Sequence, residues 1–306
     1  MRPRIWYLCI TLMLPVLVST SVLADDEIPD TVMVIANLND DNGDTVVDDN
    51  DVPDLIYHFI ATNGDQVFRA VSGKGGSVLF EKQDRNHYWF PPFSHLAVGD
   101  IDSDGMPEIV SQFMEGGSVI RLVAYEHDGE FKWHSDPFEP LSYIPGAGMT
   151  FADLDDDGTI EILAGDDEFL RVYNSDGSFR WKSPGSRCSF ACVADLDLDG
   201  STDIVYGGTA YRKDGSILWS NPLVSGDCAI GEFDGDAHPE ITVLGTRSIG
   251  TGWGFDIPVR MRSIGTGWGK TAPFSTRSIG SLWGSPVHIL DQDGAILWSS
   301  IPIPAE

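Results

Sequence analysis

A nine-residue acidic segment recurs along this chain of 306 residues, and it constrains the fold more than any other feature. Each full copy has carboxylates at positions 1, 3, 5 and 9 and glycine at position 6, and a short apolar run such as Ile109-Val110 follows. Glycine allows the sharp turn that gathers the carboxylates around one point, and the backbone carbonyl of position 7 adds another oxygen. Calcium prefers such oxygen donors, so the segment predicts a row of calcium-binding loops.

The alternative interpretation is a series of Asx-turns in acidic surface loops, but regular recurrence within a repeating unit favours calcium. The last copy is looser, because alanine replaces the glycine and a longer glutamate takes position 1, and we expect it to bind more weakly. The predicted ligands in the four copies are Asp100, Asp102, Asp104 and Glu108; Asp153, Asp155, Asp157 and Glu161; Asp195, Asp197, Asp199 and Asp203; and Glu232, Asp234, Asp236 and Glu240.

An earlier acidic segment has the spacing of an EF-hand loop. Thr45 stands where that loop has glycine, and an aspartate replaces the usual final glutamate. A solvated acidic loop without metal is the alternative. The predicted ligands are the side chains of Asp40, Asn42, Asp44, Asp48 and Asp51, with the carbonyl of Val46.

A second repeated element follows each acidic loop. It is a tight turn between alternating apolar runs, and the strand after it carries an aromatic residue. Asp-Gly between such runs predicts a type I′ hairpin turn, with positive φ at both central residues. We expect the aromatic residue to pack between neighbouring sheets rather than to stack on a ligand. The Asp-Gly pairs begin at Asp128, Asp176, Asp214 and Asp293, and Ser72–Phe80 is a divergent first copy.

Together these elements give four short antiparallel strands in each unit of about 40 to 50 residues. The sequence therefore predicts an all-β fold, a β-propeller of four-stranded antiparallel blades. Five blades are present, a number that also fits part of a larger propeller. Their expected bounds are 31–82, 95–135, 148–183, 189–221 and 228–300.

The loops and hairpins resemble the FG-GAP/VCBS-type repeats of the integrin α-subunit propeller and its bacterial secreted relatives. The resemblance covers residues 31–300. It implies calcium in loops on one face of the propeller and ligand contacts mainly on the other. It does not imply one activity, because such repeats occur in adhesins, in surface scaffolds and in propeller-shaped enzymes.

Residues 1–24 have the pattern of a secretory signal peptide, with Arg2 and Arg4 before the apolar stretch Ile5–Val18. We therefore expect a secreted protein, extracellular or periplasmic, whose residues 25–306 form the propeller domain. No membrane span is expected, because the apolar stretch is short and no later segment is long enough. The formal net charge of −28 argues against nucleic acid and anionic membranes as partners.

Three cysteines follow the leader: Cys188, Cys192 and Cys228. Export favours one disulfide among them, and the sequence does not choose the pair.

Residues 246–285 do not fit a blade. They hold near-identical copies of one short motif, starting at Arg247, Arg262 and Arg277, and they interrupt the fifth blade between its second and third strands. A glycine-rich loop without function is favoured over a contact between its arginines and tryptophans and a glycan or acidic partner.

Two functions remain open at this stage. The first is a calcium-stabilised adhesion or interaction module, a monomer or part of a larger surface assembly, whose ligand is a protein or glycan surface. The second is a calcium-dependent polysaccharide lyase or hydrolase on the same scaffold. The seven histidines share no motif, and the acidic pairs are already explained by the loops, so no catalytic residue is assigned.

Overall fold

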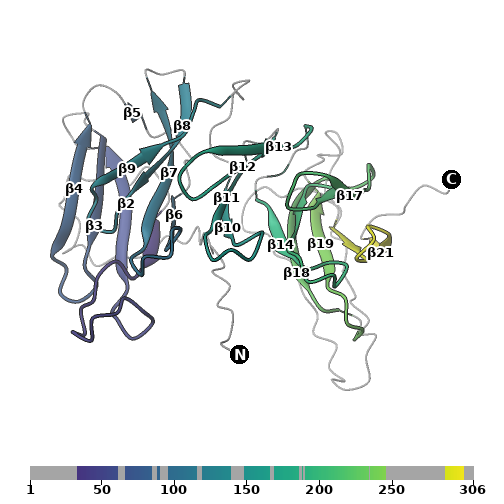
Figure 1. The fold of residues 1–306 in the computed structure, drawn as a ribbon, viewed down its shortest axis with the longest axis horizontal. Helices are drawn as coiled ribbons and strands as arrows, with labels where there is room; N and C mark the ends of the chain where they lie inside the picture. The colour runs from purple at the N-terminus through teal and green to yellow at the C-terminus, as the bar shows by residue number, and fades with distance from the viewer. Residues whose placement is uncertain are drawn as a thin grey trace, which may run out of the picture. The chain divides into compact units, whose positions relative to one another are not determined.

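A computed structural model shows the fold of the chain (Figure 1). It describes residues 33–60, 66–84, 88–89, 96–115, 119–138, 148–165, 169–185, 188, 190–233, 235–245 and 287–299. The predicted signal peptide, residues 1–24, and the predicted insert, residues 246–285, lie outside the described residues. The chain divides into two compact units, residues 1–167 with 171–182, and residues 168–170 with 183–306. The parts of the chain that the structure describes are built from strands and turns, without helices.

The first unit holds three antiparallel sheets. The chain passes through each sheet strand by strand, as expected for propeller blades. A short additional strand, β5, pairs with the far end of β7 and makes the second sheet five-stranded. The strands are β1 (Met33–Ala36), β2 (Asp54–Ile60), β3 (Gln66–Val71) and β4 (Val78–Asp84); β5 (Tyr88–Trp89), β6 (Leu96–Gly99), β7 (Glu108–Glu115), β8 (Val119–Tyr125) and β9 (Phe131–His134); and β10 (Met149–Ala152), β11 (Glu161–Gly165), β12 (Leu170–Tyr173) and β13 (Phe179–Lys182).

The second unit holds two four-stranded antiparallel sheets in the same strand order. The strands are β14 (Cys192–Ala194), β15 (Asp203–Tyr206), β16 (Thr209–Tyr211) and β17 (Ile217–Ser220); and β18 (Gly226–Gly231), β19 (Glu240–Gly245), β20 (Val287–Leu290) and β21 (Ile296–Ser299). The five sheets correspond to the five predicted blades, although β5 lies outside the predicted bounds, β4 extends to Asp84 and β18 begins at Gly226.

The core forms between neighbouring sheets of a unit, because each strand alternates its side chains between two faces. In the first unit one cluster includes Ile101, Leu122 and Ile162, all fully buried. In the second unit Val205 and Ile241 are likewise fully buried in one cluster. Packing of this kind explains why the middle strands are almost continuously apolar.

Aromatic side chains and turn glycines pair across neighbouring sheets. A Cβ atom on Gly129 would meet the ring of Phe80 at 2.6 Å, and one on Gly294 would meet Trp219 at 2.5 Å. The ring of one sheet therefore lies against the Asp-Gly turn of the next. The prediction that the repeated aromatic residues pack between sheets is confirmed.

The predicted type I′ turn is wrong. Only the glycine of each Asp-Gly pair has positive φ, for example 81° at Gly129, while Asp128 does not. The amide of Gly129 donates to the carbonyl of Glu126, and Glu126 N donates to Glu130 O, both at 2.8 Å. This is a type I turn closed by a left-handed glycine, with a bulge in the strand pairing. Asp-Gly suits both turn types, so the dipeptide alone does not separate them.

A disulfide joins Cys192 of β14 to Cys228 of β18, and Cys188 is the free, buried thiol. Burial raises the pKa of Cys188 to about 12, so this thiol stays protonated and unreactive at neutral pH.

Candidate metal-binding loops

The position-9 carboxylate of each acidic loop lies at the first residue of the second strand, opposite the last residue of the first. Strand register places it there, as in the pairs Gly99↔Glu108 and Ala152↔Glu161. Glu108 is fully buried and accepts a 2.9 Å hydrogen bond from the amide of Ile101 at position 2. The apolar side chain at position 2 is itself buried, so it anchors the loop while the glutamate closes it.

Two left-handed residues shape each full loop. The glycine at position 6 has positive φ as predicted, 93° at Gly105. Position 4 is left-handed as well, with φ of 63° at Ser103, 60° at Asp156 and 57° at Leu198. Serine, aspartate and leucine share no signal for this conformation, so the sequence does not reveal it.

The resulting turn directs backbone N–H groups at the position-1 carboxylate. Asp100 accepts hydrogen bonds from the amides of Asp104 and Gly105, at 3.1 and 3.0 Å. Asp195 accepts the equivalent bonds from Asp199 and Gly200, at 3.0 and 2.9 Å. The loop is therefore held in shape by its own backbone.

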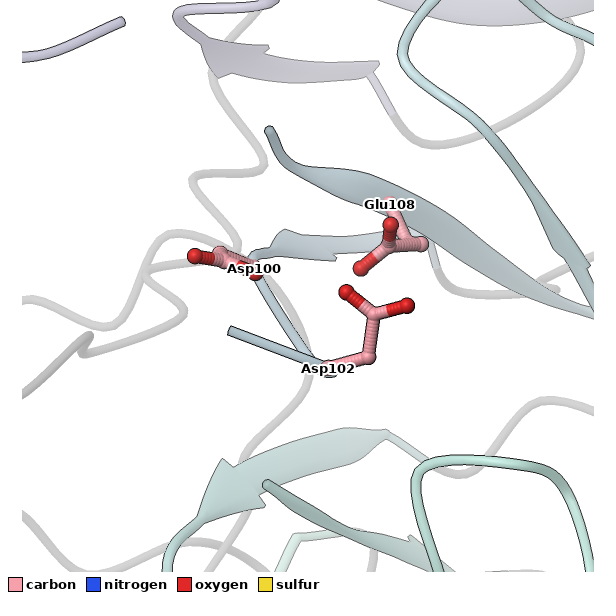
Figure 2. A group of neighbouring side chains, drawn as sticks. All are labelled: Asp100, Asp102 and Glu108. Atoms are coloured by element: carbon pink, nitrogen blue, oxygen red, sulfur yellow. The ribbon is translucent and has the colours of Figure 1, made fainter. Parts of the chain in front are cut away.

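Three acidic clusters result, and in each the carboxylate oxygens lie within 4.8 Å of one another. Figure 2 shows the carboxylates of Asp102 and Glu108 facing each other, with Asp100 beside them. Positions 1, 3 and 9 meet in the second and third blades, whereas positions 1, 3 and 5 meet in the fourth. The clusters are Asp100, Asp102 and Glu108; Asp153, Asp155 and Glu161; and Asp195, Asp197 and Asp199.

Some predicted ligands lie outside these clusters because their carboxylates accept hydrogen bonds within the loop instead. Asp104 accepts the amide of Met106 at 2.8 Å, and Asp157 accepts both the amide and the hydroxyl of Thr159. Asp203, the position-9 residue of the fourth blade, is buried and accepts the amide of Leu196 at 3.2 Å.

The donor set of these clusters fits a hard cation. Asp153 Oδ1 and Asp155 Oδ1 are shielded from solvent and have no hydrogen-bond partner. A buried carboxylate oxygen without a hydrogen-bond partner is energetically unfavourable unless a cation or a water molecule binds it. Oxygen-only donors of this charge suit calcium or a similar hard divalent ion.

Burial opposes ionisation of the position-9 groups. It raises the pKa of Glu108 to about 7 and that of Asp203 to about 6, and hydrogen bonds from the position-2 amides offset only part of the effect. A bound cation would restore the charged form, because it favours the carboxylate.

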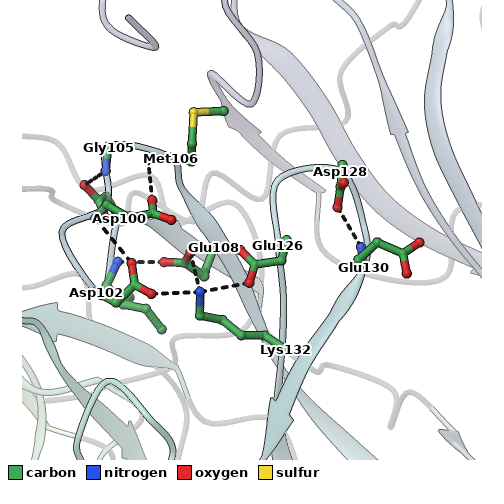
Figure 3. Close-up of polar contacts among 11 residues, drawn as sticks. Asp100, Asp102, Gly105, Met106, Glu108, Glu126, Asp128, Glu130 and Lys132 are labelled. Carbon is green, nitrogen blue, oxygen red and sulfur yellow. Dashed lines mark hydrogen bonds and ion pairs between the residues drawn. The ribbon is translucent and has the colours of Figure 1, made fainter.

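Basic side chains reach each cluster from elsewhere in the same sheet. Lys132 contacts Asp102 and Glu108, as Figure 3 shows, and Arg180 contacts Asp155 and Glu161. In the fourth blade Arg212 lies 3.3 Å from Asp197 and 3.4 Å from Asp199. These cations are not close in sequence to the loops, so spacing did not point to them.

The first blade contains a buried carboxylate that the sequence interpretation missed. Asp54 opens β2, is fully buried, and accepts the amide of Leu38 at 2.9 Å, as Glu108 does from Ile101. The available signal was the acidic residue directly before an apolar pair, here Leu55-Ile56.

The predicted EF-hand-like ligands lie between Leu38 and Asp54. Gly43 and Thr45 are left-handed, with φ of 87° and 74°, and their amides donate to Asp40. Asp51 is buried and accepts backbone amides, including those of Asp48 and Asn42. This segment thus repeats the left-handed pattern of the acidic loops, and Asp51 links its backbone amides.

The other predicted ligands of this segment accept hydrogen bonds from nearby backbone amides: Asn42 from Asp44, Asp44 from Val46, and Asp48 from Asn50.

The fifth blade departs from the pattern. Gly235, at position 4, has φ of 90° and donates its amide to Glu232, while Ala237 at position 6 is not left-handed. Asp236 accepts the amide of His238, and Glu240 is fully buried at the start of β19. Asp234 lies outside the described residues.

Residues 100–164 match the model of the FG-GAP-like repeat. This segment of the chain therefore carries the FG-GAP-like repeat. The matched segment begins at the first full acidic loop and extends into the strand after the second, so it contains the first two clusters of the FG-GAP repeats. No curated protein matches the chain in sequence.

Solved structures share the fold. The V. cholerae biofilm matrix protein Bap1 is similar with a TM-score of 0.56 and 22% identity, over 87% of this chain and 38% of that one. Bacillus licheniformis rhamnogalacturonan lyase PL11 gives 0.58 and 16%, over 87% and 50%. Rhamnogalacturonan lyase YesW gives 0.52 and 18%, over 89% and 58%. The chain thus spans between 38% and 58% of the length of these proteins, and at this identity the likeness concerns the fold alone.

No helix among the described residues is long and apolar enough to cross a membrane.

Proposed function

We propose that this FG-GAP repeat protein is an exported, calcium-binding module that attaches to a protein or glycan surface. The observation that carries the calcium assignment is the recurrence of acidic clusters in three equivalent loops. Three loops bring oxygen donors within 4.8 Å of one another, and solvent-shielded oxygens of Asp153 and Asp155 lack partners. Export is supported by the leader pattern and by the disulfide between Cys192 and Cys228.

The binding role is supported by how the ionisable groups are used. Within the described part of the chain, the acidic clusters lie in strand connections, and Glu108 and Glu161 close their loops by accepting the position-2 amides. His58 is buried, and burial lowers its pKa to about 3, so it is a neutral core residue rather than a proton-transfer group. A biofilm matrix protein among the similar structures supports a surface-binding role.

A polysaccharide lyase is the second candidate. It is favoured by the rhamnogalacturonan lyases whose folds cover 87% to 89% of this chain. One experiment separates the two functions. Purified protein is incubated with a panel of polysaccharides, with calcium or with chelator, and both retention on immobilised polysaccharide and release of unsaturated sugars are followed. Retention without release is expected, and sustained release would establish the lyase instead.

Elemental analysis of the purified protein and calorimetric titration test the metal. We expect calcium to bind at more than one site. A protein that neither contains nor binds calcium would refute the proposal.

A further inference from the structure

Lys132 occupies the acidic cluster of the second blade. Its ammonium nitrogen lies 2.8 Å from Asp102 Oδ2, 3.1 Å from Glu108 Oε1 and 2.9 Å from Glu126 Oε1. Figure 3 shows Lys132 between these three carboxylates. The side chain is 17% exposed, and Glu108 is fully buried. Hence the ammonium supplies positive charge where the loop concentrates negative charge.

Arg180 repeats this arrangement in the third blade. Its guanidinium lies 2.8 Å from Asp155 Oδ2 and 2.8 Å from Glu161 Oε1. Lys132 and Arg180 hold the same place in the repeat, because each directly precedes the tryptophan of the outer strand. Both therefore bind the position-3 and position-9 carboxylates of their loop.

The same two carboxylates belong to the clusters that would hold a metal. A divalent ion among Asp100, Asp102 and Glu108 would lie beside the ammonium of Lys132. Like charges repel strongly at that separation in a partly buried site, so the ion and the ammonium compete for one position.

We propose that Lys132 and Arg180 are resident counter-ions that a bound divalent cation displaces, and that this exchange sets the metal affinity of the second and third loops. The inference rests on the proposed calcium function. Lysine suits the role because its charge sits on a flexible four-carbon stem. Glu126 lies outside the nine-residue loop and remains as a partner for the displaced ammonium.

The exchange is confined to two blades. Leucine directly precedes the aromatic residue in the other outer strands, at Leu79, Leu218 and Leu297. In the fourth blade Arg212 approaches from the end of β16 instead, at longer distances and with 42% of its side chain exposed. The acidic loops therefore differ in how closely a basic side chain is bound to them, and so in what a calcium ion must displace.

The test compares Lys132→Met with Lys82→Met. Lys82 forms a surface ion pair with Glu130 at 2.7 Å and has no ion pair with an acidic loop among the described residues. Its replacement changes the net charge by the same amount. Calcium affinity is measured by calorimetric titration, and the melting temperature is measured in chelator and in calcium. We expect Lys132→Met to strengthen one calcium site about tenfold or more and to lower the melting temperature in chelator, while Lys82→Met does neither.

A wild-type measurement covers the case in which Lys132→Met does not fold in chelator. The side-chain NMR signals of the lysines are followed during calcium titration, and the most protected ammonium should lose its protection as calcium binds. Unchanged or weaker calcium binding in Lys132→Met, or an ammonium that stays protected in calcium, overturns the exchange and leaves the calcium proposal standing. Absence of calcium binding in every variant overturns both.

Discussion

The ring of Trp133 lies against Gly177 of the next sheet, so closely that a Cβ atom there would be 2.5 Å from Cε3. Gly177 also has φ of 78°. The glycine is therefore required for two independent reasons, its backbone conformation and the contact with the tryptophan.

Two glycine variants separate the effect of the backbone conformation from the effect of the contact with the tryptophan. Gly158 has φ of 92° but nothing within 4 Å of its Cβ position. In chelator, we expect Gly158→Ala to lower the free energy of unfolding by about 1 kcal/mol, and Gly177→Ala by about 2 kcal/mol more because the ring must move. Urea unfolding measures both, and equal losses would contradict the proposed packing.

Calcium removal should destabilise the protein. Chelation leaves the carboxylates of each cluster without their cation, and a ligand that binds only the native state raises stability by mass action. We expect the melting temperature to fall by several degrees and magnesium to restore it poorly, because magnesium demands a tighter octahedral site.

The loops should also differ in affinity for calcium. Asp155→Ala removes a member of a formed cluster, whereas Asp236→Ala alters the loop whose position 6 is Ala237. We therefore expect Asp155→Ala to cost more calcium affinity in calorimetric titration. The opposite order would contradict the ligand assignment.

Acid should destabilise the protein through His58. Burial lowers its pKa to about 3 from an ordinary value of 6.5, so the unfolded state binds the proton more readily. Stability is fully present above about pH 6.5 and declines toward pH 3. In chelator, we expect the wild type to lose about 2 kcal/mol more than His58→Leu between pH 7.5 and 5, as followed by urea unfolding. Parallel pH profiles would refute this role for His58.

The disulfide should stabilise the second unit. Cys192 and Cys228 are 36 residues apart, and closing a loop of that length removes about 3 to 4 kcal/mol of unfolded-state entropy. The double variant with serine at both positions should lose that amount in urea unfolding under oxidising conditions. Cys188→Ala, which keeps the disulfide, serves as the control and should lose much less.

Deletion of residues 246–285 should leave the fold intact. The strands on either side, β19 and β20, are hairpin neighbours with Leu244 opposite Val287. A short Asn-Gly turn can therefore join them, and long surface insertions add little to loop-closure entropy. We expect an unchanged or higher melting temperature, and loss of soluble protein would show that the insert belongs to the core.

Periodic features of the sequence were sufficient for the sheets and for the carboxylates that gather in the three acidic clusters. Spacing alone placed Asp100, Asp102 and Glu108 together, because the strand register is set by the apolar runs on both sides. Contacts between residues that are far apart in the sequence could not be predicted from spacing. Lys132 and Arg180 enter their clusters from the outer strand, and Asp54 is separated from Leu38 by an inserted loop.

The turn type could not be predicted from the sequence either, since Asp-Gly is compatible with both the type I′ turn and the type I turn followed by a left-handed glycine. The pair of disulfide cysteines was decided by the strands that carry them, β14 and β18, which lie side by side in one unit.

The aromatic–glycine contacts of the first unit run in one direction along the chain. Phe80 and Trp133 each project from an earlier sheet onto the turn of a later one, at Gly129 and Gly177. Loss of the later sheet uncovers a large ring in the earlier one, whereas loss of the earlier sheet only opens space beside a glycine. We therefore expect local unfolding of one sheet to expose most apolar surface in its N-terminal neighbour.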